Sequence, residues 1–248
     1  MIVIKTPAEL EIMREANRVV ARVLQALSRE VKPGVDTAAL DAKAERLCRQ
    51  MGARPAFKGY RGYPYSLCCS VNEQVVHGFP GRRRLKEGDI LSLDFGAVLD
   101  GFYGDAALTL PVGEVGPQAH RLMEATRRAL MAGIEMMRPG NRLGDVSAAV
   151  QQTVEQAGFS VVRQFVGHGI GRELHEEPQL PNYGTPGKGV TLKPGMVIAI
   201  EPMVNAGSYE VDILDDGWTA VTRDGSLSAH FEHTVAVTED GPRILSRP

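Results

Sequence analysis

The stretch DILSLDFGAVLDGFYGDAALTLP occupies residues 89–111 and consists of two apolar segments on either side of the dipeptide Asp100-Gly101. An Asp-Gly pair between two apolar segments is typical of a two-residue β-hairpin turn. We therefore predict that residues 89–98 and 102–111 form a pair of antiparallel strands.

A turn at these two residues pairs Asp94 with Ala107 and Gly96 with Asp105. Opposed residues share a face of a sheet, and so do residues two apart, so we expect the two carboxylates to point the same way, roughly 7–8 Å apart at the backbone. Two carboxylates on an otherwise apolar hairpin repel each other unless positive charge lies between them. A bound cation would supply that charge.

Two more acids interrupt apolar, strand-like segments: Glu201 follows residues 197–200 and precedes a proline, and Glu232 alternates with apolar residues. Each one alone is as well interpreted as a structural group, either a solvated edge carboxylate or a buried one paired with arginine, as a functional group. Four such acids in one chain favour a shared metal site. His168 is flanked by glycines, which let the backbone pass close to a ligand, and is the candidate imidazole.

The strand that carries Asp94 belongs to an internal repeat. Residues 85–94 (LKEGDILSLD) match residues 192–201 (LKPGMVIAIE) at an offset of 107, and residues 32–34 match 138–140 at an offset of 106. The agreement predicts a duplicated α/β unit of about 105 residues, packed as two halves of one domain. Chance similarity between common Lys-Pro-Gly turns is the alternative.

Helices are predicted where apolar residues recur at steps of three and four. The first begins at the capping box Thr6-Pro7-Ala8-Glu9, and three others are expected at residues 37–51, 117–137 and 143–157. Further strands are expected at residues 161–165, 196–200, 208–214 and 230–238.

The composition is that of a globular protein, with 248 residues, 43% of them hydrophobic, and a net charge of −2. This charge argues against nucleic acid as a substrate and against attraction to a membrane. The three cysteines, two of them adjacent, form neither a disulfide framework nor a metal knuckle. With no leader-like N-terminus, these features predict a soluble, cytoplasmic protein. Residues 82–84 are three arginines, interpreted as a solvated loop, with ribosomal RNA contact as the alternative.

Two short motifs suggest other enzymes but lack the context that those enzymes require. Asp94-Phe95-Gly96 spells the kinase DFG motif, yet the chain has no GxGxxG loop and no HRD motif. His175-Glu176 begins like a zincin HExxH motif, but Pro178 would break the helix on which that motif lies. Neither activity is predicted.

Residues 165–183 (FVGHGIGRELHEEPQLPNY) are similar along their whole length to the signature of the type I methionine aminopeptidases of the short bacterial kind. The resemblance extends from Ile4 to Thr234. It implies the pita-bread (creatinase/aminopeptidase) α/β, or α+β, fold, in which two pseudo-twofold related halves surround a curved antiparallel sheet. We therefore expect a single catalytic domain over residues 1–248, with halves at about 1–110 and 111–248.

The resemblance also implies a metal-dependent removal of the initiator methionine from nascent polypeptides whose second residue is small, through attack by a metal-activated water. The family's five metal ligands match Asp94, Asp105, His168, Glu201 and Glu232 in type, order and context. In the family, the first binds one metal, the second and fifth bridge two, and the others complete the second site. Four carboxylates and one imidazole suit Mn, Fe(II) or Co, with Zn as an alternative, so two divalent metal ions are expected.

By the same resemblance His77, His175 and Glu201 are the catalytic residues. The residues matched to the substrate pocket are Tyr60, Tyr63, Cys68, His77, Leu174, His175 and Trp218. Leu174 stands where phenylalanine is common in the family. The expected partners are nascent polypeptide N-termini, with transient ribosome contact left open, and a monomer is expected. Aminopeptidase P or prolidase, and a metal-free binding module of the same fold, are the alternative functions.

Overall fold

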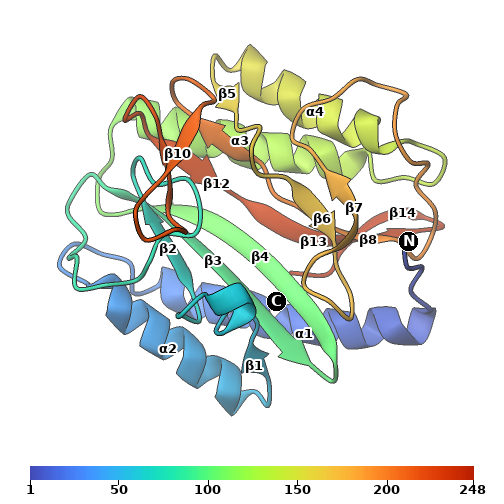
Figure 1. The fold of residues 1–248 in the computed structure, drawn as a ribbon, viewed down its shortest axis with the longest axis horizontal. Helices are drawn as coiled ribbons and strands as arrows, with labels where there is room; N and C mark the ends of the chain where they lie inside the picture. The colour runs from blue at the N-terminus through green and yellow to red at the C-terminus, as the bar shows by residue number, and fades with distance from the viewer.

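The computed structural model describes all 248 residues as one large antiparallel sheet, two small sheets and four α-helices (Figure 1). The helices are α1 (Pro7–Ser28), α2 (Thr37–Gln50), α3 (Pro117–Glu135) and α4 (Leu143–Gln156), with a short 3₁₀ turn at Tyr60–Gly62. The strands of the large sheet are β1 (Arg54–Pro55), β2 (Cys68–Val71), β3 (Ile90–Leu99), β4 (Phe102–Pro111), β6 (Gly167–Gly169), β7 (Glu176–Leu180), β8 (Val197–Ile200), β13 (Glu232–Thr238) and β14 (Gly241–Ile244). The small sheets contain β5 (Ser160–Val161), β9 (Met203–Asn205) and β12 (Ser228–His230), and β10 (Val211–Ile213) and β11 (Ala220–Thr222).

The predicted hairpin is confirmed. Strands β3 and β4 pair so that Asp94 faces Ala107 and Gly96 faces Asp105. Asp100 and Gly101 both have positive φ, 49° and 78°, which is the requirement of the type I′ turn. The Asp-Gly dipeptide therefore determined the register of the strands that carry the first two acids.

The two parts of the chain that the repeat relates have equivalent strands and turns. The sheet order β3-β4-β13-β8-β6, with β2 beside β3, places the first half (β2, β3, β4) and the second half (β6, β8, β13) symmetrically about the seam between β4 and β13. Gly34 and Gly140 have φ of 89° and 91°, and donate backbone hydrogen bonds to Leu85 and Leu192 respectively. In Figure 1, α1 with α2 and α3 with α4 lie at the bottom and the top of the view, one pair for each half.

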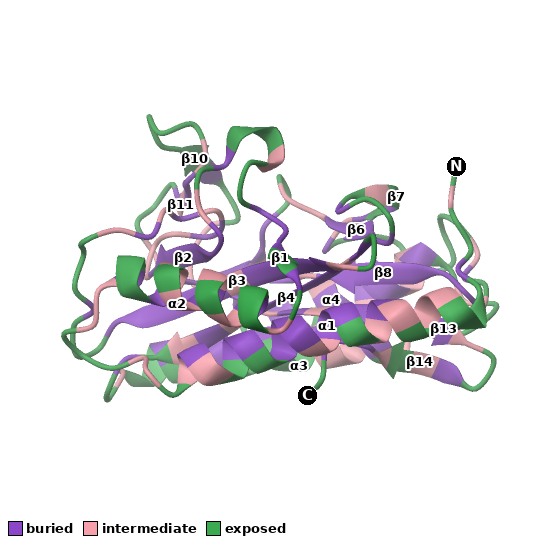
Figure 2. Cartoon of the chain, turned by 90° about the horizontal axis from the view of Figure 1, so that it is seen from below, coloured by how far each residue is buried: buried purple, intermediate pink, exposed green.

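The helices cover one face of the sheet. Leu91, Leu93 and Phe95 of β3 pack into the same cluster as α1 and α2, and Ile198 and Ile200 of β8 pack with residues of α3 and α4. Figure 2 shows α1 and α3 along the lower side of the sheet, with β6, β7 and the β10–β11 hairpin above it. The alternate residues of the strands therefore face the side without helices.

Residues 230–238 do not form one strand, contrary to the prediction. The chain changes partner at Phe231: β12 pairs with β9 in a small sheet, and β13 pairs with β4 and β8 in the large one. The Thr109 hydroxyl accepts a hydrogen bond from the His230 N–H and donates one to the His230 carbonyl, both at 2.8 Å. A side chain thus replaces the strand ladder at this point, which alternation of apolar residues cannot reveal.

The expected strands at 161–165 and 208–214 are also shorter than predicted, since only Ser160–Val161 and Val211–Ile213 pair. The four helices lie where they were expected, within two residues at their ends. No helix of the structure combines the length and the apolar character that a membrane span requires.

Strand β4 lies directly against α1 at Gly104, and this contact gives a test of the packing beside Asp105. A Cβ atom at Gly104 would lie 2.9 Å from the Asn17 Cα and backbone nitrogen. We expect Gly104→Ala to lower the free energy of unfolding by about 1–3 kcal/mol, because the helix backbone cannot move aside cheaply. Urea denaturation checks this, with Gly81→Ala as the control, since nothing lies within 4 Å of a Cβ at Gly81. Equal stability of the two variants would contradict the prediction.

Candidate functional site

The register of the sheet brings the five candidate ligands to one face. Asp94 lies opposite Ala107, and Ala107 lies opposite Glu232, so these side chains form one row across β3, β4 and β13. A second row contains Asp105, which faces Gly96, and His168, which faces Ala199 of β8. Residues two apart share a face, so both rows point away from the helices.

Glu201 immediately follows β8, two residues beyond Ala199, and completes the group. The segment around His168 requires glycines on both sides. A Cβ at Gly167 would lie 2.4 Å from the Ala199 carbonyl oxygen, and one at Gly169 would lie 2.3 Å from the Glu177 oxygen. The Gly-His-Gly sequence therefore lets β6 approach its neighbours closely enough to bring the imidazole to the acids.

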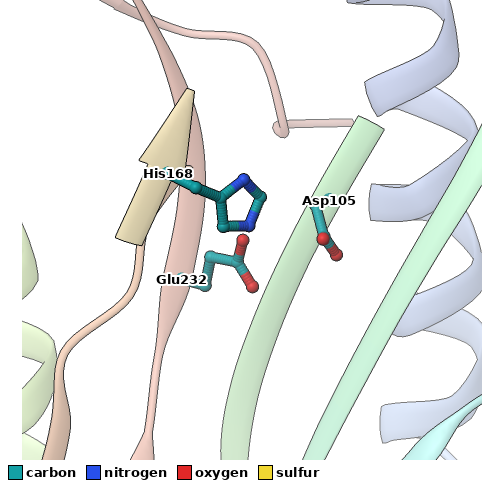
Figure 3. Close-up of side chains that lie close together, drawn as sticks. All are labelled: Asp105, His168 and Glu232. Carbon is teal, nitrogen blue, oxygen red and sulfur yellow. The ribbon is translucent and has the colours of Figure 1, made fainter. Parts of the chain in front are cut away.

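The side chains converge on a shared space. Ligand atoms of Asp105, His168 and Glu232 all lie within 4.8 Å of one another, and these residues are buried. Figure 3 shows the three side chains pointing toward a common centre from β4, β6 and β13. The His168 Nε2 atom lies 3.4 Å from the Glu201 Oε1 atom.

This group forms the floor of a cavity of about 170 Å³. All twelve residues that were predicted to bind metal, bind substrate or act in catalysis line it, together with two that were not predicted. The predicted residues are Tyr60, Tyr63, Cys68, His77, Asp94, Asp105, His168, Leu174, His175, Glu201, Trp218 and Glu232, and the others are Phe57 and Arg61.

The electrostatics of the floor fit a cation. Asp94 Oδ1, Asp105 Oδ1 and Glu232 Oε1 are buried oxygens without a hydrogen-bond partner. No lysine or arginine forms an ion pair with any of the four carboxylates; the only basic groups within 4.0 Å are His168 and His230, both beside Glu201. Removal from water raises the pKa of all four carboxyls, and the charge of Asp94 raises that of Asp105 further. Oxygen-rich donors that lack partners fit hard divalent metal ions.

His168 presents a lone pair to this group. Its Nδ1 atom lies 2.9 Å from the carbonyl oxygen of Gly169, which can only accept, so Nδ1 carries the proton. The Nε2 atom is then free to bind a metal, which is the usual arrangement for a metal-binding histidine. Burial lowers the pKa of His168 to about 3, and the nearby His175 contributes, so the ring is neutral.

The wall above Asp94 is aromatic and apolar. Tyr63 is buried and packs edge-on against Trp218, with ring centroids 5.1 Å apart, and against Phe79 at 5.4 Å. The Tyr63 hydroxyl donates to backbone carbonyls at 3.2 and 3.3 Å, which anchors the ring. Cys68 and Leu174 are buried in the same cluster. This wall can bind an apolar side chain next to the acidic floor.

Two histidines stand between the floor and the solvent. His77 packs against Phe165 and Trp218, at centroid distances of 5.3 and 6.0 Å. His175 lies at the exposed mouth of the cavity, where its Nδ1 atom is 2.8 Å from the Tyr60 hydroxyl. Burial lowers the pKa of each ring to about 4, and the charge of Arg61 adds to the effect on His175. Both rings are neutral near pH 7 and can exchange hydrogen bonds with a peptide.

Sequence reasoning missed one further residue beside the site. His230 is 1% exposed, and its Nε2 atom has no hydrogen-bond partner although it lies 3.9 Å from the Glu201 Oε2 atom. It occupies the end of β12, next to the change of strand partner at Phe231. Because the prediction treated residues 230–238 as one strand, only a knowledge of that break could have pointed to it.

The chain is similar to known proteins of one family. The model of the family described as metallopeptidase family M24 matches residues 11–239. Methionine aminopeptidase 1 from Bacillus subtilis is 55% identical over 247 residues, which cover 100% of both chains. The crystal structure of a methionine aminopeptidase from Thermotoga maritima has a TM-score of 0.99 and 52% identity, and it too covers 100% of both chains.

The chain also resembles the prolidase from Pyrococcus furiosus, with a TM-score of 0.82 and 25% identity over 99% of this chain and 66% of that one. These likenesses confirm the predicted fold class, the pita-bread arrangement of two related halves around an antiparallel sheet.

Proposed function

Because the chain belongs to the metallopeptidase family M24, among the type I methionine aminopeptidases of the short bacterial form, we propose that it removes the N-terminal methionine of nascent polypeptides in a metal-dependent reaction. It is a hydrolase of the aminopeptidase class. The observation that carries the metal dependence is the group of four carboxylates and one imidazole on one sheet face, with three buried oxygens lacking partners.

The proposed metal ligands are Asp94, Asp105, His168, Glu201 and Glu232. Two divalent ions, Mn, Fe(II) or Co with Zn as an alternative, suit this oxygen-rich set. Metal ions bound there would polarise the scissile carbonyl and lower the pKa of a bound water. Four carboxylates and a neutral imidazole compensate the charge of two such ions, and this balance supports the proposal.

The remaining chemistry is assigned to side chains of the cavity. Glu201 is proposed to take the proton of the attacking water, because its carboxylate lies beside His168 and its pKa is raised by burial. His175 is proposed to donate a hydrogen bond to the carbonyl oxygen as negative charge develops there. His77 is proposed to contact the scissile amide.

Specificity for methionine is assigned to the aromatic wall. A flexible thioether side chain packs well against aromatic rings, and Tyr63 and Trp218 present such rings. Tyr60, Cys68 and Leu174 complete the lining. The further proposal, that only a small second residue is accepted, is supported by the similarity to the methionine aminopeptidases.

We propose that the catalytic unit is one domain, residues 1–248, acting as a monomer in the cytoplasm. In support of a single catalytic domain, the first half provides Asp94 and Asp105 and the second half provides the other three proposed ligands, so neither half holds the whole set. Arg82, Arg83 and Arg84 are exposed and remain candidates for a transient ribosome contact.

A comparison of peptides tests the proposal. The metal-loaded chain is expected to release methionine from a Met-Gly-type peptide, progressively less from Met-Xaa peptides as the second residue grows, and nothing from an Xaa-Pro peptide. Release from Xaa-Pro alone would assign the chain to a prolidase-like activity instead. Purification without any metal and no turnover of either peptide would favour a binding module.

A further inference from the structure

A buried ion pair lies outside the proposed catalytic group. The Lys5 Nζ atom donates a hydrogen bond to the Glu176 Oε2 atom at 2.5 Å, and the two side chains are only 2% and 9% exposed. Lys5 precedes α1, and its backbone N–H donates to the Gly195 carbonyl at 2.8 Å. Its Nζ atom also donates to the Val3 carbonyl at 3.2 Å. The segment before the first helix is thereby attached to the second half of the molecule.

The second carboxylate oxygen of Glu176 holds the loop at residues 172–176 in a closed conformation. The Glu176 Oε1 atom accepts hydrogen bonds from the backbone N–H groups of Arg172 and Glu173, at 2.8 and 3.3 Å. The closed segment contains Leu174 and His175, which line the cavity. The Glu176 carboxylate therefore links Lys5 to the backbone of Arg172 and Glu173, which immediately precede Leu174 and His175.

The pair packs closely against the backbone at Gly171. A Cβ at Gly171 would lie 2.5 Å from both the Glu176 Oε1 and the Lys5 Cε atoms. A second contact between the same parts is far more exposed: the Arg172 Nη2 atom lies 3.2 Å from the Glu9 Oε1 atom, with side chains 64% and 28% exposed. The buried pair, rather than this surface pair, is the restraint that water cannot replace.

We propose that Lys5 and Glu176 are positioning residues that hold the loop at residues 171–176, and with it Leu174 in the wall of the cavity and His175 at its mouth. The proposal rests on the proposed function for its effect on catalysis. Neutralising Lys5 leaves the Glu176 carboxylate buried without its counter-charge, and the carboxylate then has to move toward water. Such a movement releases the two backbone N–H groups and the loop that they hold.

The first experiment measures backbone hydrogen exchange in Lys5→Met and Glu176→Gln, two substitutions that keep approximate size and remove charge. Exchange of the Arg172 and Glu173 amides is expected to quicken at least tenfold, and Lys5→Arg is expected to restore part of the protection. Lys43→Met is the matched control, because it breaks another Lys–Glu pair, with Glu30, that lies far from this loop in sequence and is more exposed. Unchanged exchange in both folded variants would overturn the proposal.

The second experiment measures kinetics on a Met-Gly-type peptide at a temperature where all variants are folded. We expect kcat/KM to fall at least tenfold in Lys5→Met and Glu176→Gln, with KM raised through Leu174 and kcat lowered through His175, and metal content unchanged. A purely structural role would lower thermal stability but keep kcat/KM within twofold of the parent, and that result would also overturn the proposal. If the parent itself released no methionine, the proposed function would fail, while the exchange experiment would still decide whether the pair holds the loop.

Discussion

Asp105→Asn is expected to lower kcat/KM for a Met-Gly-type peptide on the order of 1,000-fold, more than the 10–100-fold typical of losing an outer partner of a metal ligand. The change keeps the size of the side chain but removes its charge. Asp105 Oδ1 is buried without a partner, and the residue contributes one of the three ligand atoms that lie within 4.8 Å of one another. An amide at this position leaves the bound ions with less negative charge. Steady-state kinetics and metal content by mass spectrometry together check the prediction.

The control for this variant is Asp100→Asn, in the turn of the same hairpin. Asp100 is exposed and has φ of 49°, a conformation that asparagine adopts readily. We expect unchanged kinetics and unchanged metal content in this variant. Full activity of Asp105→Asn, at full metal occupancy, would refute its assignment as a ligand.

Removal of metal by a chelator is expected to abolish methionine release and to make the stability of the chain depend strongly on pH. The folded, metal-free chain holds carboxyl groups whose pKa values are raised by burial, at Asp105, Glu201 and Glu232 in particular. The unfolded chain binds fewer protons at these groups near neutral pH, so stability falls as the pH rises. Each excess proton held by the folded state corresponds to about 1.4 kcal/mol per pH unit.

Between pH 7 and 8, the effect of these carboxyls on stability can be separated from that of the buried histidines and thiols. The histidines of the site have pKa values lowered to about 3 or 4 in the folded chain. They therefore lower the free energy of unfolding only as the pH falls below about 6.5, the pKa of histidine in the unfolded chain. The buried thiols, whose pKa values are raised, cost stability only above about pH 8.5. Between pH 7 and 8 the carboxyls alone remain, and the melting temperature of the metal-free chain is expected to fall by roughly 3–5 °C for each excess proton.

Divalent metal should reverse this dependence. Metal binding requires deprotonated ligands and stabilises only the folded state, by ~2.7 kcal/mol at a concentration 100 times the dissociation constant. We expect added Mn or Co to raise the melting temperature more at pH 8 than at pH 7, as scanning calorimetry would measure. A metal-free melting temperature that is flat or rises across this window would contradict the picture of carboxyls held protonated by burial.

Local sequence features were sufficient to predict the elements whose residues lie close together along the chain. The Asp100-Gly101 dipeptide determined the register that places Asp94 and Asp105 on one face. The capping box at Thr6 began α1, and the matching glycines at 34 and 140 revealed the two halves. Such features depend on backbone conformations that a few adjacent residues select by themselves. Residues such as His77 and Trp218 were predicted to belong to the site only through the resemblance to a family.

Only the tertiary structure decided how the two halves meet. Strands β4 and β13 pair over just two positions at the seam, and this pairing brings Glu232 level with Asp94. The same holds for the change of strand partner at Phe231. It holds also for two contacts between residues far apart in the chain, His230 with Glu201 and Lys5 with Glu176. Strand pairing and buried ion pairs gain their energy from partners that no local pattern specifies, so the sequence determined which side chains were available, and packing determined which of them meet.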